Sequence, residues 1–370
     1  MGKKSTTSGT KARKHKRNKK VESRGNDHPN STGRPENEQV SPDWQQWAAQ
    51  RLLSGAPLAE VIAALVASGV SEHTAATLCA HTYADPIFDA ARSVSQQLRK
   101  INSTLAIRAS LAALNPALAD VERRSRLSAR SFVEKYYAAN RPVVITDAAS
   151  RWPAIERWTP DYLVEQVGGE EVEVMSGRDA DPNYEVNSAS HKHVMPFDEY
   201  VRKVVDTGAS NDIYLVANNH LLDSAAADGL WSDVTLDKRY LNPARARGHT
   251  FLWFGPAGTV TPLHHDTMNV MFHQVLGRKR ITLISPLDTR YLYNSRSVYS
   301  DVRLEEPDLE RFPEFTRATQ TQVIVEPGEA LFIPVGWWHH VEALDLSISV
   351  SSTAFIAVNS FDWFLPDPVG

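Results

Sequence analysis

The chain has 370 residues, an ordinary apolar fraction and one cysteine, Cys79, so it can form a sizeable core but no intramolecular disulfide. It has no run of about eighteen apolar residues and no apolar stretch near its N-terminus, which argues against a membrane-spanning helix and a secretory signal. These features favour a cytoplasmic protein with no membrane partner.

Residues 1–41 are expected to form a disordered, basic tail. The first 40 residues carry eleven Lys and Arg against four Asp and Glu, although the whole chain has a net charge of −4. The tail has too few large apolar residues to bury a core. Its run at 11–20 is compatible with nucleic acid binding, but no aromatic residue interleaves it, and a solubilising role is the more frequent outcome.

Residues 42–120 are expected to be helical. The pattern predicts helices over 42–53 and 58–68, a third capped by Ser71, and a long fourth that begins at Pro86. Apolar residues of the fourth helix recur every three or four positions, as in Phe88, Ala91, Val94, Leu98, Ile101 and Leu105. This spacing is compatible with helix pairing in a homodimer, although packing onto the helix's own domain is more frequent.

Residues 121–370 carry mostly strand and turn signals. Ser131 and Glu134 have the spacing of a capping box at the start of a short helix. Strands are expected over 142–145, 171–175, 213–217, 250–254, 270–276, 280–284, 321–325, 330–333, 339–342 and 346–352. Many short strands separated by Gly and Pro indicate a sandwich or a barrel.

His264 and Asp266 are two residues apart, so on a strand both side chains project to the same face while His265 faces the other way. Such a pair supplies two ligands of a 2-His-1-carboxylate facial triad, which leaves open positions on Fe(II). The third ligand must be a histidine brought back by the fold. The spacing alone does not choose between His339 and His340.

Lys279 follows the turn at Gly277-Arg278, so its strand is expected to return antiparallel beside the ligand strand. If this lysine is buried, it needs a carboxylate, and a dicarboxylic cosubstrate held by iron at one end would supply it. Thr261 and Tyr214 could donate further hydrogen bonds. The alternative is a solvated turn lysine, which Lys279 taken alone slightly favours.

Several motifs in one order resemble the Jumonji-C hydroxylases, a group of cupin-fold enzymes that depend on Fe(II) and 2-oxoglutarate. These motifs are Thr261–Asp266, Gly277–Arg280, Pro327–Pro334, Trp337–His340 and Leu344–Val350. The resemblance covers about residues 131–356 and is strongest to small asparaginyl and arginyl hydroxylases. It implies a mainly β fold with α-helices, in which a cupin, or double-stranded β-helix (jelly roll), forms the catalytic domain.

The resemblance also assigns the site. It implies that His264, Asp266 and His339 bind iron, with His339 favoured over His340 because it directly follows the aromatic pair. It further implies that Lys279, Thr261 and Tyr214 hold the distal carboxylate of 2-oxoglutarate.

One position departs from the family pattern, because Val270 stands where many relatives have an asparagine. The neighbouring Asn269 is expected to face the other way in a regular strand. Of the remaining histidines, His265 is expected to pack or meet solvent, His273 to lie on a strand surface or near substrate, and His340 to be a core group. Trp338 is a candidate wall of the substrate cleft.

The expected activity is hydroxylation of a protein or peptide side chain, coupled to conversion of 2-oxoglutarate to succinate and CO₂. The alternatives are an RNA hydroxylase, an N-methyl-lysine demethylase with the same chemistry, and a metal-binding cupin that acts without turnover as an interaction module.

Overall fold

A computed structural model describes residues 40–118, 120–216 and 219–364, and nearly all of the expected basic tail lies outside these ranges. The chain divides into two compact units, residues 1–98 and 99–370. The division falls within one long helix, and the domain boundaries expected at residues 41 and 120 stay predictions.

The helices are α1 (Pro42–Leu53), α2 (Leu58–Ala67), α3 (Glu72–Ala84), α4 (Pro86–Ala113), α5 (Ala129–Phe132), α6 (Ala154–Arg157), α7 (Pro160–Val167), α8 (Ser188–His191), α9 (Phe197–Thr207) and α10 (Asp228–Ser232). The strands are β1 (Glu122–Arg124), β2 (Val143–Ile145), β3 (Glu171–Met175), β4 (Lys192–Pro196), β5 (Thr250–Gly255), β6 (Val260–His265), β7 (Val270–Leu276), β8 (Lys279–Ile284), β9 (Gln320–Val325), β10 (Ala330–Ile333), β11 (Trp338–Ala343) and β12 (Ser347–Ser352).

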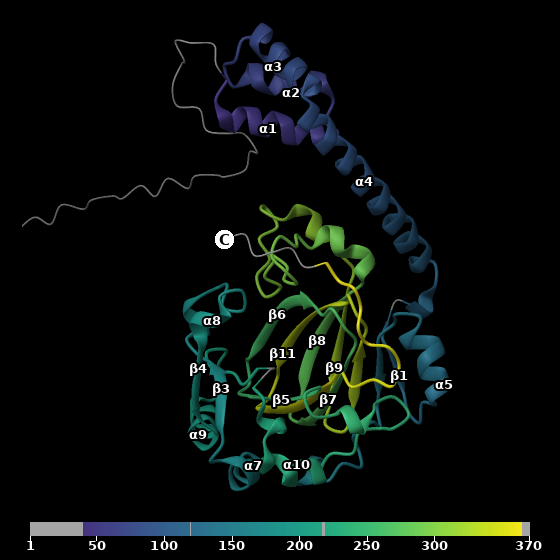
Figure 1. The fold of residues 1–370 in the computed structure, drawn as a ribbon, viewed down its shortest axis with the longest axis vertical. Coiled ribbons are helices and arrows are strands. Elements are labelled where there is room, and N and C mark those ends of the chain that lie inside the picture. The colour runs from purple at the N-terminus through teal and green to yellow at the C-terminus, as the bar shows by residue number, and fades with distance from the viewer. Residues whose placement is uncertain (1–39, 119, 217–218, 365–370) are drawn as a thin grey trace, which may run out of the picture. The chain divides into compact units, whose positions relative to one another are not determined.

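The first unit consists of α1–α3 and the start of α4 (Figure 1). The expected cap of α3 is present, because the Ser71 hydroxyl accepts from the Thr74 amide. Ser41, which was not predicted as a cap, accepts from the Trp44 amide in the same way at the start of α1. These bonds satisfy amides that the first helical turn leaves free. A small buried cluster holds the helices together, and Cys79 belongs to it, as expected.

Helix α4 differs from the expectation that its apolar face packs onto its own domain. Phe88 is its only buried residue. Val94, Leu98 and Ile101, which share the predicted apolar face, are 66%, 56% and 59% exposed. The helical periodicity was therefore predicted correctly, but the described part of the chain does not cover this stripe.

Two sheets form the body of the second unit (Figure 1). The larger has the order β1-β2-β10-β7-β12-β5, and the smaller has the order β6-β11-β8-β9. All four residues of β10 are buried, which explains its continuous apolar sequence. A separate pair, β3-β4, runs antiparallel. The expected mixture of a β-rich jelly-roll arrangement with helices is confirmed.

The smaller sheet corrects the expectation that the strand of Lys279 returns antiparallel beside the ligand strand. Strand β8 lies in the same sheet as β6, but β11 lies between them. Lys279 opens β8, which pairs with β11 and β9, whereas β7 belongs to the larger sheet. The turn therefore crosses from one sheet to the other. Gly277 makes this possible, because it has φ +67° and a Cβ there would lie 2.2 Å from the Leu346 carbonyl oxygen.

Two local expectations were also wrong. The cap of α5 is Ser128, whose hydroxyl accepts from the Ser131 amide, so Ser131 itself lies inside the helix. The described part of the segment expected as a strand at 213–217 forms only isolated bridges, at Tyr214 and Leu215. Both errors concern short elements, for which local sequence signals are weak.

Among the described residues, none of the helices combines the length and the apolar character that crossing a bilayer requires. The cytoplasmic location stays a prediction.

Candidate metal and cosubstrate site

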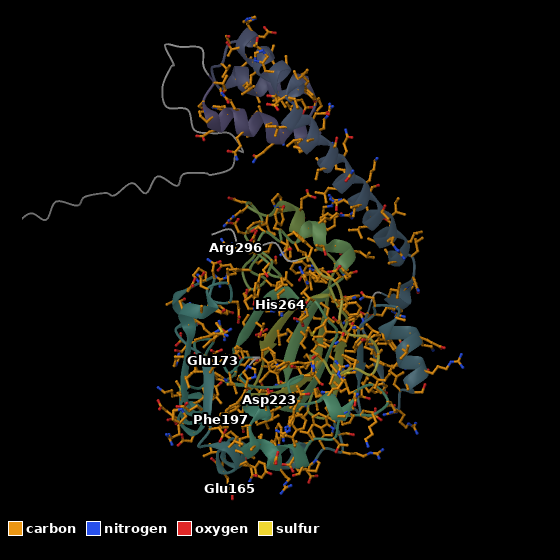
Figure 2. All side chains as sticks on the ribbon, viewed as in Figure 1. Glu165, Glu173, Phe197, Asp223, His264 and Arg296 are labelled. Atoms are coloured by element: carbon orange, nitrogen blue, oxygen red, sulfur yellow. The ribbon has the colours of Figure 1, made fainter. Side chains whose placement is uncertain are left out.

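The side chains of His264, Asp266 and His339 meet at one end of the smaller sheet. Their ligand atoms all lie within 4.8 Å of one another, and His339 Nε2 lies 3.6 Å from Asp266 Oδ2. The cause is strand pairing, because His264 and His339 are direct partners across the antiparallel pair β6–β11. Figure 2 labels His264 among the strands of this unit.

Both histidines are oriented by the backbone. Nδ1 of His264 lies 2.7 Å from the Pro262 carbonyl oxygen, and Nδ1 of His339 lies 3.0 Å from that of Trp337. A carbonyl only accepts, so Nδ1 carries the proton in each ring and Nε2 keeps a free lone pair. Burial, reinforced by the neighbouring His339, lowers the pKa of His264 to about 4. Its imidazole is therefore neutral at pH 7, which is the form that binds a metal.

A cavity of about 460 Å³ opens beside these three side chains. Residues singled out from the sequence line it together: Tyr214, Thr261, His264, Asp266, Lys279 and His339. Its walls also include Phe251, Trp253, Phe272, Ile333, Val341, Ser351 and Thr353. Apart from Ile333, which falls within the Pro327–Pro334 motif, no local motif marks these residues, because they come from segments far apart in the sequence.

Lys279 is 1% exposed, so the solvated alternative is excluded. Its ammonium donates one hydrogen bond, 2.8 Å long, to the Tyr214 hydroxyl, and no carboxylate of the described residues lies within 4 Å of it. Burial lowers the pKa of Lys279 to about 7. An ammonium can donate three hydrogen bonds, so this group lacks partners and counter-charge.

Tyr214 is buried, and this burial raises the pKa of its phenol, which stays a neutral group at pH 7. The tyrosine lies outside the two main sheets, on a segment bridged to Met175 of β3. Lys279 and Tyr214, 65 residues apart in sequence, thus meet at one place in the cavity.

The structure does not bring an asparagine to the position where many relatives have one and this chain has Val270. Val270 lines the cavity, whereas Asn269 faces away and donates to the Asn359 side chain at 2.9 Å. The Asn269 side-chain oxygen accepts from the Val335 amide. Asn269 is therefore a structural residue, and no bulge turns it into the cavity.

The structure also places three further histidines and Trp338. His265 packs between the rings of Trp338 and Trp363, each with its centroid 4.7 Å away, as expected for a packing role. His273 is buried, with Nδ1 3.1 Å from the Val350 carbonyl oxygen, so its expected surface position was wrong. Trp338 is fully buried and does not line the cavity beside His264, so it is a core residue and not a wall of that cavity. His340 is buried against Glu305, as expected for a core group.

Residues 129–364 match the family model described as a cupin-like domain. The chain belongs to this family.

Two of three similar proteins are named lysine-specific demethylases. The chain is 34% identical over 231 residues to "Lysine-specific demethylase 8" of Xenopus tropicalis, which covers 60% of the chain and 50% of the relative. It is 34% identical to "Lysine-specific demethylase JMJ30" of Arabidopsis thaliana, over 62% of the chain and 54% of the relative. It is 32% identical to "HSPB1-associated protein 1" of Bos taurus, over 57% of the chain and 48% of the relative.

These matches confirm the Jumonji-C cupin resemblance. The cupin-like chain spans about half the length of the curated relatives that it matches.

Proposed function

We propose that this cupin-like protein is an Fe(II)- and 2-oxoglutarate-dependent oxygenase that hydroxylates a side chain of a protein or peptide. One observation carries the proposal: a buried, unneutralised lysine lies in the same cavity as a preorganised His-Asp-His cluster. That combination matches a cosubstrate that chelates a metal at one end and carries a carboxylate at the other.

The three clustered side chains fit a resident Fe(II). Two neutral imidazoles and one carboxylate form the donor set of the facial triad. Both imidazoles present Nε2 because their Nδ1 atoms are engaged by backbone carbonyls. His264, Asp266 and His339 would therefore hold the metal.

The deep part of the cavity fits 2-oxoglutarate. The Lys279 ammonium would hold the distal carboxylate, and the Tyr214 and Thr261 hydroxyls lie on the same cavity wall to donate further hydrogen bonds. The bound iron and 2-oxoglutarate would supply the oxidation of an unactivated C–H bond, with release of succinate and CO₂.

The protein's own residues have the tasks of binding, orientation and exclusion of water. Phe272, Ile333 and Val341 give the cavity apolar walls, which strengthen the electrostatic contact between Lys279 and a carboxylate. Backbone carbonyls keep the two histidine rings in one tautomer and one orientation. No side chain needs to act as a general base, because the oxidised bond is a C–H bond.

A protein or peptide is the substrate class that the relatives' names favour, since two of them are named lysine-specific demethylases. Demethylation is the second candidate for the same reason. Hydroxylation of an N-methyl group releases formaldehyde, whereas hydroxylation of a side-chain carbon adds one oxygen and releases none. Formaldehyde release therefore separates the two activities.

RNA binding through the basic tail and homodimer formation stay predictions from the sequence. Deletion of residues 1–39 tests the first. If RNA binding is unchanged and insensitive to salt after deletion, the tail has no such role.

The activity is tested with purified protein, Fe(II) and 2-oxoglutarate. We expect succinate from the wild type and at least about a hundredfold less from His264→Ala and Asp266→Ala, because loss of a ligand removes the metal. His220→Ala, a side chain that is 72% exposed, is the matched control and should keep full turnover. A wild type without turnover that still binds metal would favour the interaction module. Unchanged turnover in His264→Ala and Asp266→Ala would refute the site.

A further inference from the structure

A second cavity, of about 160 Å³, adjoins the metal centre. Tyr299 lines it, and the Tyr299 ring centroid lies 5.8 Å from that of His264. The walls come from residues 182–186, from residues 299–303 and from Pro262 of β6. A group bound there would therefore lie beside the proposed oxidation site.

The acidic residues of this second cavity already have partners. Glu185 pairs with Arg178 at 3.2 Å, and the Arg178 side chain is fully buried. Glu305 Oε1 lies 3.2 Å from His340 Nε2. Asp301 accepts a hydrogen bond, 2.8 Å long, from the Ser295 hydroxyl.

Three arginines of the same cavity, Arg296, Arg303 and Arg311, do not have such partners. Within the described residues, none of their guanidinium groups forms an ion pair or a side-chain hydrogen bond, although most other arginines of this unit do. Arg311 lies over the Phe312 ring at 4.8 Å. Burial opposes the lowering of the Glu305 pKa, the hydrogen bond with His340 is the main cause of it, and the Arg303 charge adds to it more weakly, without forming an ion pair.

The formal charges of the lining residues balance, with three arginines and three acids. What the cavity can bind therefore depends on which of these charged side chains already have a partner within the protein. Its carboxylates are engaged from within the fold, while its guanidinium groups are free to accept a ligand. The Tyr299 hydroxyl, which also lines the cavity, adds a donor, and no described residue accepts a hydrogen bond from it.

We propose that this cavity, the arginine pocket, binds an acidic side chain of the substrate peptide next to the residue that is oxidised. Guanidinium groups are planar donors that match carboxylates and phosphates in a bidentate manner. Figure 2 labels both Arg296 and His264 on the second unit, so the anion site and the metal centre belong to one compact unit. The assignment rests on the proposed function and names its substrate class as acidic peptides.

The test measures binding, without turnover, to the full chain loaded with Mn(II) and 2-oxoglutarate. The probes are acetyl-Ala-Glu-Ala-amide, the matched glutamine peptide and the matched phosphoserine peptide, each followed by saturation-transfer NMR at physiological salt. Each probe is short and carries few charges, so at this salt concentration its binding to the basic tail is weak. We expect a preference of about fivefold for glutamate over glutamine, the size that a few exposed ion pairs provide.

The variant Arg296→Gln/Arg303→Gln/Arg311→Gln should reduce this preference to less than about twofold. The matched control, Arg126→Gln/Arg151→Gln/Arg245→Gln, removes the same charge from exposed arginines elsewhere and should keep the preference. Equal effects of the two triple variants, or no preference in the wild type, would overturn the proposal. Tighter binding of the phosphoserine peptide would support the pocket and assign its anion to a phosphorylated residue.

Failure of this proposal and failure of the proposed function are distinguishable. If the pocket is wrong, succinate is still formed and the glutamate and glutamine peptides bind alike. If the oxygenase function is wrong, no succinate is formed, while the charge preference of the peptide probes can still be measured. Thermal unfolding of both triple variants checks that each is folded.

Discussion

At the residue scale, Lys279 is a buried ammonium that donates a single hydrogen bond. It is buried with one neutral partner, Tyr214, and lies in the cavity that contains the proposed iron ligands. A carboxylate bound there would supply the missing counter-charge. The sequence alone slightly favoured a solvated lysine, because Arg278 and Arg280 flank it.

We predict that Lys279→Met raises the KM for 2-oxoglutarate at least about tenfold, since a charge-assisted hydrogen bond in a buried site is lost. Arg280→Met is the matched control, because Arg280 is the next residue, is partly exposed and pairs with Glu342. The KM of each variant is measured from the rate of succinate formation at varied 2-oxoglutarate concentration. A KM that changes equally in the two variants would contradict the role of Lys279.

The affinity for 2-oxoglutarate should depend on pH through Lys279. Burial lowers the pKa of its ammonium to about 7, so the ligand-free protein loses this proton as the pH rises above 7. A carboxylate favours the charged form, so binding above pH 7 takes up a proton. We expect the affinity to fall by about tenfold per pH unit above 7 and to level off below it, as measured by calorimetry with Mn(II).

Substitutions at the neighbouring residues Asn269 and Val270 should affect different properties, namely stability and 2-oxoglutarate binding. Asn269→Ala should lower the free energy of unfolding by about 1–3 kcal/mol, because it leaves the Val335 amide without its acceptor, and should leave 2-oxoglutarate binding unchanged. Val270→Asn should tighten 2-oxoglutarate binding, because it places an amide in the cavity. Denaturant unfolding and calorimetry separate the two, and weaker 2-oxoglutarate binding in Asn269→Ala would contradict this division.

At the element scale, β11 organises the site. It lies between β6 and β8, so one strand places His339 opposite His264 while its other edge pairs with the strand that begins at Lys279. The proposed metal and carboxylate contacts are therefore linked by a single sheet. A hairpin between β7 and β8 would have put Lys279 in the other sheet.

We predict that two copies of the chain associate through helix α4. Ile87, Val94, Leu98 and Ile101 lie on one exposed stripe, and residues 1–39 contain only Met1 and Val21 as large apolar residues that could cover it. We expect Leu98→Gln/Ile101→Gln to weaken any dimer at least about tenfold in sedimentation experiments, because a helical pair buries such a stripe.

The control for this helix is Ile107→Gln/Leu111→Gln. These residues are also exposed, at 59% and 62%. At 100° per residue, Ile107 lies about 150° and Leu111 about 110° around α4 from the centre of the stripe. A wild type that stays monomeric at about 100 µM, or an equal loss in both variants, would show that the stripe has no such role.

At the scale of the whole molecule, metal and cosubstrate should stabilise the second unit by mass action, because only the folded chain assembles the site. We expect Mn(II) with 2-oxoglutarate at about a hundred times its Kd to raise the free energy of unfolding by about 2.7 kcal/mol. Lys279→Met should lose the increment due to 2-oxoglutarate and keep that due to Mn(II). Thermal scans measure both increments, and removal of the metal by a chelator should reverse them.

The sequence by itself determined the local periodicities and the chemical identity of the donor set. Helices α1 and α3, strands β3 and β10, and the two-residue spacing of His264 and Asp266 follow from short-range patterns. The resemblance then supplied His339, which spacing alone did not separate from His340. It also supplied the cupin fold and the expected cofactors.

Only the tertiary structure decided which strands are neighbours and which side chains are buried. It moved Lys279 from a supposed hairpin to the inside of a cavity, buried His273 and Trp338, and left one face of α4 exposed. The arginine pocket had no signal in the sequence either, because its residues come from several segments between Pro182 and Arg311. The physical reason is that strand order and burial arise from contacts between distant residues, which local periodicity does not record.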